Sequence, residues 1–394
     1  MPRPAWLRVT WPPSRRTAAA GLLVGAAALS GGAWLGLSGG GRPVAGVPSP
    51  TAGVTPPQSA VPSRESAPPA TPKLTPPPAG ATCPLNGLPV DDPAALQRTA
   101  LAVQIENHPA ARPVRNLGLA DMVVEATVEG DVTRYTGIFL CRATEGLTGP
   151  VRSGRYYSID LWQDLHVLPY FFGAGHDARE LYEEAGMPFV NGITGAWPWF
   201  QRWGSAAAPH NLYTNLEAAR GAFTTDRRLQ DLASRVGSLR PPFAFRAEAR
   251  PTGRAAGSVV IWTNGFWHFG WTWNPDRLHW ERDEAGTPNV DAGSGEILSA
   301  RSVIVQLVRE DVVYGPSDPA GNPRRYHHMV GSGTATLYLD GRAIDLRWSR
   351  PSAADGTSWT YADTGAAVSL PPGVVWWEIM PLSSRVVESG GSFS

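Results

Sequence analysis

The spacing of hydrophobic residues predicts strands and helices in alternation over the first half of the folded part. Segments in which apolar, β-branched and aromatic residues alternate or cluster are typical of strands, whereas apolar residues three or four apart are typical of helices. The expected strands are residues 100–106, 122–128, 135–141 and 167–172. The expected helices are residues 158–165, 178–185 and one or two within 216–232, with a short turn or helix at 117–120.

The pattern changes after a stretch rich in proline and arginine at residues 239–254. Beyond it the chain alternates between strand patterns and turn signals such as Asp340-Gly341 and Pro372-Gly373. The expected strands are 258–263, 278–282, 302–308, 333–339, 343–348, 367–370 and 374–380. The predicted fold class is therefore α+β, with a mixed α/β N-terminal half containing a layered sheet (82–245) and a β-rich C-terminal half (255–394).

The N-terminus has the pattern of a membrane anchor or an export signal. Four arginines precede an uncharged, moderately apolar run over residues 17–41, so residues 1–41 are expected to form a cytoplasmic tail and a signal or anchor segment. Positive charge before such a run keeps the N-terminus inside and places the body outside the membrane. The alternative is a cleaved signal peptide, with small residues at Ala27, Ser30 and Ala33, and secretion of the body.

A second zone, residues 42–80, is expected to be a disordered linker. Positions 41–80 contain 12 prolines, and Ser, Thr, Ala and Gly fill most of the rest. Such a composition buries too little apolar surface to offset the entropy of ordering. We therefore expect a membrane protein with one N-terminal anchor, a semi-extended tether and an extracytoplasmic body.

Charge and composition exclude several classes of protein. Residues 81–394 carry 27 basic and 33 acidic residues, an excess of acid that argues against a nucleic-acid partner. Lys73 is the single lysine, so a mechanism that depends on lysine is excluded from the body. Two cysteines are too few for a cysteine-rich zinc module. Because export is expected and the count is even, Cys83 and Cys141 are expected to form a disulfide; the alternative is two unpaired thiols.

Arginines form the densest candidate for ligand binding. Arg152 and Arg155 lie in a Gly-flanked segment that leads into a predicted helix, and Arg134 opens the third predicted strand. Guanidinium groups in this setting suit a carboxylate, a phosphate or another anionic group. The alternative is an internal ion-pair network with carboxylates. Its candidate members are Glu129, Asp131 and Asp160.

Three polar segments each follow a predicted strand and could share one edge of a sheet, provided that the strands are parallel: Glu106–His108, Glu129–Asp131 and Gly173–His176. Glu106 and Glu129 are candidates for a hydrolytic carboxylate pair, and His210 for a general acid–base. The alternative is that these side chains fix loops by hydrogen bonds to the backbone. The further candidate ligand-binding residues are Asn107, His108, Asp131, His176, Asn211 and Tyr213.

No cofactor or metal is expected from the sequence. His327 and His328 are adjacent and would point to opposite faces of a strand. Residues 291–296 lack the spacing of a calcium loop and are better interpreted as a turn. The tryptophan-rich segments 197–203 and 263–275 are interpreted as core packing, with a glycan platform or a protein interface as the alternative. Trp267, Trp271 and Trp273 alternate as on one face of a strand.

Several segments resemble the YerB-like family of bacterial envelope lipoproteins, whose two halves are described as domains of unknown function. The segments are CPLNGLP (83–89), AVQIENHPAARP (102–113), LADMVVEATVEGDVTRY (119–135), GPVRSGRYYSIDL (149–161), FFGAG (171–175), PHNLYT (209–214), VDAGSGE (290–296), GSGTATLYLDGR (331–342) and LPPGVVWWEIMP (370–381). The resemblance implies a mixed α/β first half and a β-rich second half. It also implies a role as partner or regulator of a cell-wall synthase of the penicillin-binding class. This sequence departs from many members because no cysteine lies near its N-terminal apolar run, so lipid attachment there is excluded.

Together these observations predict an extracytoplasmic, membrane-tethered protein of the cell envelope. Its partners would be a penicillin-binding synthase or peptidoglycan, by resemblance, and the membrane through its N-terminal segment. The alternative is a hydrolase of cell-wall polymer. No recognisable catalytic motif supports an enzyme, so a binding or regulatory role is the favoured expectation.

Overall fold

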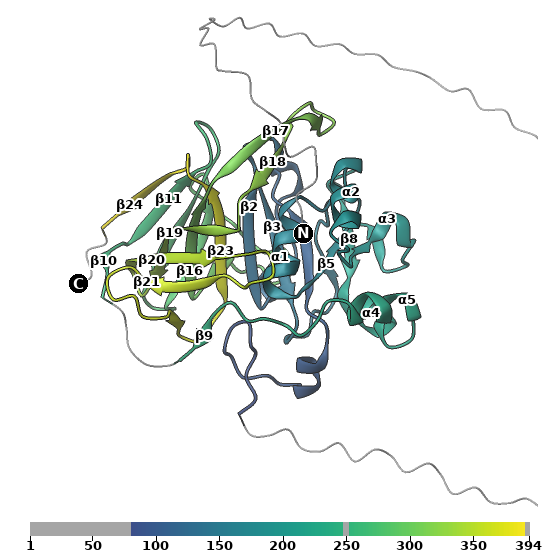
Figure 1. The fold of residues 1–394 in the computed structure, drawn as a ribbon, viewed down its shortest axis with the longest axis horizontal. Coiled ribbons are helices and arrows are strands. Elements are labelled where there is room, and N and C mark those ends of the chain that lie inside the picture. Colours follow the sequence, from purple (N-terminus) through teal and green to yellow (C-terminus); the bar gives the residue numbers. More distant parts are fainter. Residues whose placement is uncertain (1–79, 247–251, 391–394) are drawn as a thin grey trace, which may run out of the picture. The chain divides into compact units, whose positions relative to one another are not determined.

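The computed structural model describes residues 80–246 and 252–390. The expected anchor (1–41) and nearly all of the expected linker (42–80) lie outside the described residues. Within the described ranges, no helix combines the length and the apolar character needed to cross a bilayer. Residues 73–394 form one compact unit, and its architecture is that of an α+β protein, as the sequence predicts (Figure 1).

A single sheet of 11 strands runs through both halves of the chain. The first half supplies β1 (Leu101–Glu106), β2 (Met122–Thr127), β3 (Thr133–Phe139), β5 (Leu168–Phe171) and β6 (Val190–Asn191). The second half supplies β10 (Arg254–Ala255), β16 (Ser302–Val308), β19 (Gly331–Leu339), β20 (Arg342–Arg350), β21 (Ser358–Tyr361) and β23 (Val375–Pro381). The halves join where β23 pairs in parallel with β2 on one side and with β16 on the other.

The directions of the strands determine where functional side chains gather. β1 and β5 are parallel, and β2 points the same way because both β1 and β2 are antiparallel to β3. β23 and β16 continue in the direction of β2. The carboxyl ends of these five strands therefore lie along one edge of the sheet, which we call the rim. The three polar segments were expected to share one edge only if their strands were parallel. β1, β2 and β5 do run in the same direction.

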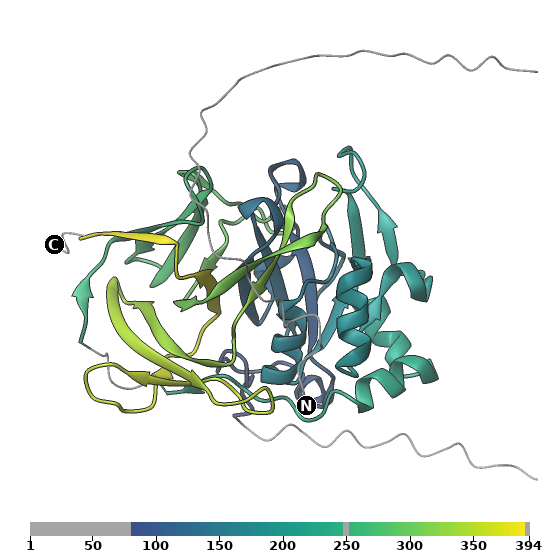
Figure 2. The ribbon, with the colours of Figure 1, turned by 45° about the horizontal axis from the view of Figure 1, so that its top comes forward.

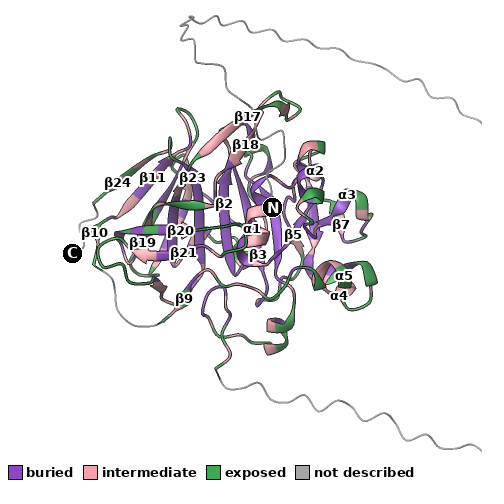
Figure 3. Ribbon diagram, in the orientation of Figure 1, coloured by how far each residue is buried: buried purple, intermediate pink, exposed green. Residues whose placement is uncertain are grey.

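The central strands are buried on both faces. Every residue of β1, β2 and β3 is buried, which explains why β1 and β2 are largely apolar along their whole length (Figure 3). Alternate residues enter two different cores, so Leu101 and Val103 belong to one cluster and Ala102 to the other. The polar residues in these strands are consequently buried as well, and they need partners.

A second sheet covers one face of the first. It consists of β11 (Ser258–Trp262), β12 (His268–Asn274), β13 (His279–Glu284), β14 (Thr287–Pro288), β15 (Ser299–Ala300) and β24 (Arg385–Ser389). Trp271 packs edge-on against Trp376 of β23, with 5.0 Å between ring centroids. The core interpretation is therefore correct for Trp271 and Trp273, whereas Trp267 lies in the loop before β12 and is 37% exposed.

Helices gather at the β5 and β6 end of the central sheet (Figure 2). They are α1 (Tyr157–Leu165), α2 (His176–Glu184), α3 (Gly192–Gly195), α4 (Leu216–Phe223) and α5 (Arg227–Ser234). The predicted helical stretch 216–232 divides into α4 and α5 because Asp226 caps the second helix. Its carboxylate accepts the backbone N–H groups of Arg228 and Leu229.

The pattern of hydrophobic residues missed many strands. Besides β6, β10, β12, β14, β15, β21 and β24, whose bounds are given above, these are β4 (Leu147–Thr148), β7 (Phe200–Arg202), β8 (Leu212–Asn215), β9 (Ala244–Phe245), β17 (Glu310–Ser317) and β18 (Pro323–His327). The last two form a hairpin rich in charged residues, and most of its side chains are half-buried or exposed. Such strands carry little apolar periodicity, so the signal on which the prediction depends is weak. β22 (Ser369–Leu370), which pairs with β9, is shorter than its predicted 367–370.

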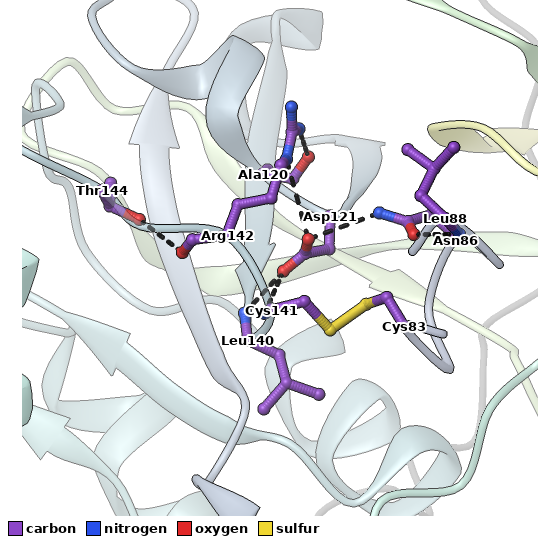
Figure 4. The surroundings of a disulfide bond; sticks show 9 residues. All are labelled: Cys83, Asn86, Leu88, Ala120, Asp121, Leu140, Cys141, Arg142 and Thr144. Atoms are coloured by element: carbon purple, nitrogen blue, oxygen red, sulfur yellow. Dashed lines mark hydrogen bonds and ion pairs between the residues drawn. A yellow bond between two sulfur atoms is a disulfide. The ribbon is translucent and has the colours of Figure 1, made fainter. Parts of the chain in front are cut away.

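The predicted disulfide between Cys83 and Cys141 is present (Figure 4). The buried Asp121 carboxylate holds the same region together by accepting the backbone N–H groups of Leu140 and Cys141, both at 2.7 Å. Cys141 follows β3, which runs against its neighbours, so the disulfide lies at the edge of the sheet opposite the rim. The chain therefore enters the body on the side away from the rim.

Candidate functional site

The candidate site is built where β1 and β5 separate at the rim. The two strands pair only from Leu101 to Val103 of β1. Beyond that point the segment 150–154 lies between them: Arg152 N–H donates to Gln104 O at 2.9 Å, and Phe172 N–H donates to Arg152 O at 3.1 Å. A crevice between diverging strands is the usual ligand position in open α/β sheets. Here it is filled by a segment that carries Arg152 and leads directly to Arg155.

Glu106 is the centre of the first cluster. It is 1% exposed, and its Oε1 lies 3.1 Å from Arg152 Nε and 3.1 Å from His210 Nδ1. The His108 ring stacks on the His210 ring with 4.9 Å between centroids. Burial, followed by the nearby His210, lowers the pKa of His108. Arg152 and His210 are 23% and 22% exposed in their side chains, so this cluster opens to solvent.

Glu129 is the centre of the second cluster and is held ionised. Its Oε2 lies 2.6 Å from Arg155 Nε, and its Oε1 lies 2.8 Å from Arg324 Nη1. Burial raises the pKa of this carboxyl, but attraction to Arg155 and hydrogen bonds from its own backbone and from Arg324 outweigh burial and lower the pKa to about 2. The free space beside Glu129 amounts to about 10 Å³, which holds no more than one water molecule.

The hairpin of β17 and β18 supplies the partners that close the rim. Arg324 also pairs with Asp177 at the start of α2, with 3.0 Å between Nε and Oδ2. Arg325 pairs with Asp131 and, at 3.2 Å, with Glu310. These contacts join the loop after β2 to a hairpin almost 200 residues further along the chain.

Arg134 lies between the two clusters and is buried, at 4% exposure. Its backbone is paired with Glu106 across β3 and β1. Its guanidinium donates through Nη1 to Ser153 O at 3.4 Å, and Nε has no hydrogen-bond partner. Burial, with repulsion from Arg155 and Arg152, lowers the pKa of Arg134 to about 9.

Asn107 and His108 fix the loop after β1. Asn107 donates to Thr133 Oγ1 at 2.7 Å and to Glu284 Oε1 at 2.9 Å, and it accepts from Arg112 Nε at 3.0 Å. His108 Nδ1 accepts the N–H of Ala110 at 3.2 Å. His108 thus fixes the loop through the backbone, as the loop-fixing alternative describes, whereas the side chain of Asn107 is held by other side chains.

The other candidate residues, His176, Asn211 and Tyr213, make their contacts with residues outside the two clusters. His176 pairs with Glu180 one turn along α2, and its side chain is 74% exposed, so it does not join the clusters. Asn211 Oδ1 accepts from Arg202 Nη1 at 2.7 Å across the β7–β8 hairpin. Tyr213 is buried and packs edge-on against Trp203.

The internal ion-pair network expected as an alternative is present, with different pairings. Arg155 meets Glu129, as considered, but Arg152 meets Glu106. Asp160 instead lies 3.5 Å from Arg350, and burial raises its pKa to about 6. Sequence reasoning missed Arg324, Arg325, Glu310 and Arg112; the dense run of charges at 323–328 was the available signal, and nothing local linked it to the rim.

Chemically, the site combines fixed ion pairs with one histidine–carboxylate pair. The general acid of a hydrolytic carboxylate pair needs a raised pKa. The pKa of Glu129 is lowered, so Glu129 does not fit the role of general acid. In the described ranges, the one grouping of three potential metal ligands is Cys83, Asp121 and Cys141. Both sulfurs there are used by the disulfide, which leaves too few ligands for an ion.

Comparison with known proteins gives consistent results across the chain. The N-terminal domain model of "Protein of unknown function (DUF3048)" matches residues 85–229, and the C-terminal domain model matches residues 258–377. The chain is 25% identical over 301 residues to "Putative lipoprotein YerB" of Bacillus subtilis (strain 168), covering 76% of this chain and 86% of the relative. The crystal structure of YerB protein from Bacillus subtilis has the same fold, with a TM-score of 0.63 at 23% identity, covering 78% of this chain and 100% of that one. The chain therefore belongs to the YerB-like DUF3048 family, as its sequence segments indicate.

Proposed function

We propose that this protein is an extracytoplasmic, membrane-tethered component of the cell envelope that acts by binding. Its partner would be the peptidoglycan synthesis machinery or peptidoglycan itself. The observation that supports binding is the state of the rim carboxylates: Glu129 is locked between two arginines, and Glu106 is shared by Arg152 and His210. Groups held in this way build a rigid, polar surface for recognition.

Four observations support the location. The disulfide is typical of an oxidising compartment outside the cytoplasm. Arginines before an uncharged run, followed by a proline-rich stretch, have the pattern of an anchor and a tether. A relative is described as a lipoprotein. Here both cysteines are consumed by the disulfide, so attachment would depend on the N-terminal segment and not on a lipid thioether.

The place of the disulfide supports an outward-facing site. The disulfide lies at the edge of the sheet opposite the rim, and at the rim the side chains of Arg152 and His210 are 23% and 22% exposed. Arginine and histidine at such a surface suit the carboxylates of stem peptides and the phosphates of wall polymers.

A second candidate function, hydrolysis of wall polymer, is favoured by one observation. Glu106 orients His210 through Nδ1, the arrangement by which a carboxylate prepares an imidazole for proton transfer. Glu129 would not take part, because its lowered pKa keeps it from donating a proton.

The experiment uses the compact body, residues 73–394, as wild type, Arg152→Ala, His210→Ala and Arg277→Ala. Arg277 is the matched control. It lies in the β12–β13 loop, pairs with Glu296 and makes no contact with the rim clusters. Each protein is incubated with peptidoglycan and, separately, with solubilised membranes in which synthases are labelled by fluorescent penicillin. Retention that Arg152→Ala weakens and Arg277→Ala does not is expected. Release of wall fragments by wild type but not by His210→Ala would replace the binding function by hydrolysis.

A further inference from the structure

A buried arginine without a carboxylate partner is the strongest unexplained feature of the rim. Across the described residues, no Asp or Glu oxygen lies within 4.0 Å of the Arg134 guanidinium, although Arg134 is 4% exposed. Its hydrogen bond to Ser153 O is long, at 3.4 Å, and its Nε has no hydrogen-bond partner. Burying a guanidinium in this state is costly, and proteins normally pair such a group.

The groups around Arg134 increase the positive charge instead of balancing it. Arg155 Nη1 donates to the same carbonyl, Ser153 O, at 3.3 Å, so two guanidiniums converge on one oxygen. Arg155 and Arg152 are the charged groups that act most strongly on Arg134, followed by Glu106. On the solvent side, Arg202 adds its positive charge to the surroundings of Arg152.

The neighbouring carboxylates are occupied elsewhere. Both oxygens of Glu129 are taken by Arg155 and Arg324. Asp131 and Glu310 engage Arg325 and are not among the groups that act most strongly on Arg134. Glu106 is the carboxylate that acts most strongly on Arg134 and Arg152, and Glu129, which also acts on Arg152, is already neutralised by Arg155 and Arg324, so the local positive charge exceeds the negative charge.

Glu106 has one unused oxygen beside these donors. Oε1 accepts from His210 and pairs with Arg152, while Oε2 is buried and has no hydrogen-bond partner. The cluster therefore presents unused guanidinium N–H donors next to an unused acceptor. Arg152 and His210, partly exposed, form its border with solvent.

We propose that this cluster binds one carboxylate or phosphate group that carries a neighbouring O–H or N–H. The anion would sit against Arg134 and Arg152, and Glu106 Oε2 would accept the neighbouring hydrogen. Guanidinium donors fixed in advance recognise planar and tetrahedral oxyanions well. The inference rests on the proposed function, because wall peptides and phosphate polymers both present such groups.

The test is calorimetric titration of the full-length chain in detergent with four probes. Inorganic phosphate and glycerol 3-phosphate represent one source, and acetate and N-acetyl-D-alanine represent the other. We expect saturable 1:1 binding of one class, with the probe that carries an O–H or N–H binding more tightly than the bare anion. Arg134→Gln should weaken binding at least tenfold, and the control Arg277→Gln should leave it unchanged.

Thermal unfolding separates a binding role from a structural one. Without an anion, Arg134→Gln should be at least as stable as the wild type, because a buried unpaired charge is removed. With the bound anion only the wild type should gain stability. Wild-type affinity in Arg134→Gln, or no binding of any probe, would overturn the site. If Arg134→Gln does not fold, Arg152→Gln replaces it, with the same tenfold criterion.

The outcome is independent of the wall assays. The small probes contain no peptidoglycan and no synthase. If no probe binds, the anion site is refuted, but the proposed binding to peptidoglycan or a synthase is still tested separately by the retention assay. Conversely, release of wall fragments would refute the proposed binding function while anion binding stayed intact.

Discussion

At the scale of single residues, Glu106 and Glu129 show how the environment decides what a carboxylate can do. Glu106 ends β1 and Glu129 follows β2, strands that both flank β3, and the two residues read alike in the sequence. Glu129 meets two guanidiniums and becomes a permanent anion, whereas Glu106 meets one guanidinium and one imidazole and retains a free oxygen. Their residue types were predictable from the sequence. Their partners were not, because Arg324 and His210 are far away along the chain.

Replacing Glu129 by Gln should destabilise the protein at neutral pH. The pKa of Glu129 is lowered from 4.5 to about 2, which corresponds to roughly 3 kcal/mol. A lowered pKa contributes stability above the unfolded value, near 4.5, and this stability is lost as the pH falls toward 2. Chemical denaturation of wild type and Glu129→Gln between pH 2 and 7 should therefore show curves that converge at acid pH. The control Glu180→Gln, on the exposed face of α2, should differ little from wild type at any pH.

At the scale of elements, the β17–β18 hairpin and the disulfide are the two devices that join distant segments. The hairpin carries Arg324 and Arg325 to the loop after β2 and to the start of α2. The disulfide joins the entry of the chain to the end of β3. The disulfide was predictable because only one pairing of two cysteines exists. The hairpin was not, because charged and half-buried strands lack a clear period.

Arg324→Met should loosen the hairpin without disturbing the central sheet. The change removes the pairs with Glu129 and Asp177 and leaves both carboxylates less well compensated. Hydrogen exchange should speed up over residues 310–327 and stay unchanged in β1 to β3. In a double-mutant cycle, Glu129→Gln and Arg324→Met should be less than additive, with a coupling of about 1–3 kcal/mol. Additive effects would mean that the pair contributes nothing to attachment of the hairpin.

Removing the disulfide should lower the stability of the whole body. The cysteines are separated by 58 residues, and closing a loop of that size in the unfolded chain is worth about 4 kcal/mol in the chain-entropy model. The variant Cys83→Ser/Cys141→Ser and the reduced wild type should show the same drop in midpoint denaturant concentration. If reduction has no effect on the wild type while the double variant unfolds, the loss comes from the substitutions and not from the crosslink.

At the scale of the whole molecule, the two sheets are joined by a buried polar network. Glu125 of β2 and Glu378 of β23 are register partners, and both are fully buried. Arg282 of the second sheet pairs with Glu125 at 2.7 Å, and Trp271 Nε1 donates to Glu378 at 3.1 Å. Arg282 also pairs with Glu284 at 3.1 Å, so its charge is shared by Glu125 and Glu284, while Glu378 accepts from Trp271. Burial, followed by the nearby Glu125, raises the pKa of Glu378 well above its usual range.

This network predicts a stability that falls as the pH rises. A carboxyl with a raised pKa in the folded state binds its proton more tightly there than in the unfolded chain. Stability should therefore decrease, by at most about 1.4 kcal/mol per pH unit, from the unfolded pKa near 4.5 up to the folded pKa. Glu378→Gln replaces the O–H donor of the protonated carboxyl with an uncharged N–H donor and should flatten this dependence, making the variant more stable than wild type at alkaline pH. The exposed Glu296→Gln serves as control, and equal slopes for Glu378→Gln and wild type would contradict the prediction.

The sequence by itself determined the class of fold, most strands of the 11-stranded sheet within a few residues, the longer helices, the disulfide, the family and the segments that carry polar chemistry. These features depend on local spacing, composition and short motifs, which are written in consecutive residues. Only the tertiary structure decided that β23 lies between β2 and β16, that residues 150–154 enter the gap between β1 and β5, and that Arg134 is left without a carboxylate. Those outcomes depend on the order in which strands pair across more than 200 residues, and the energy that selects that order is shared by the whole core.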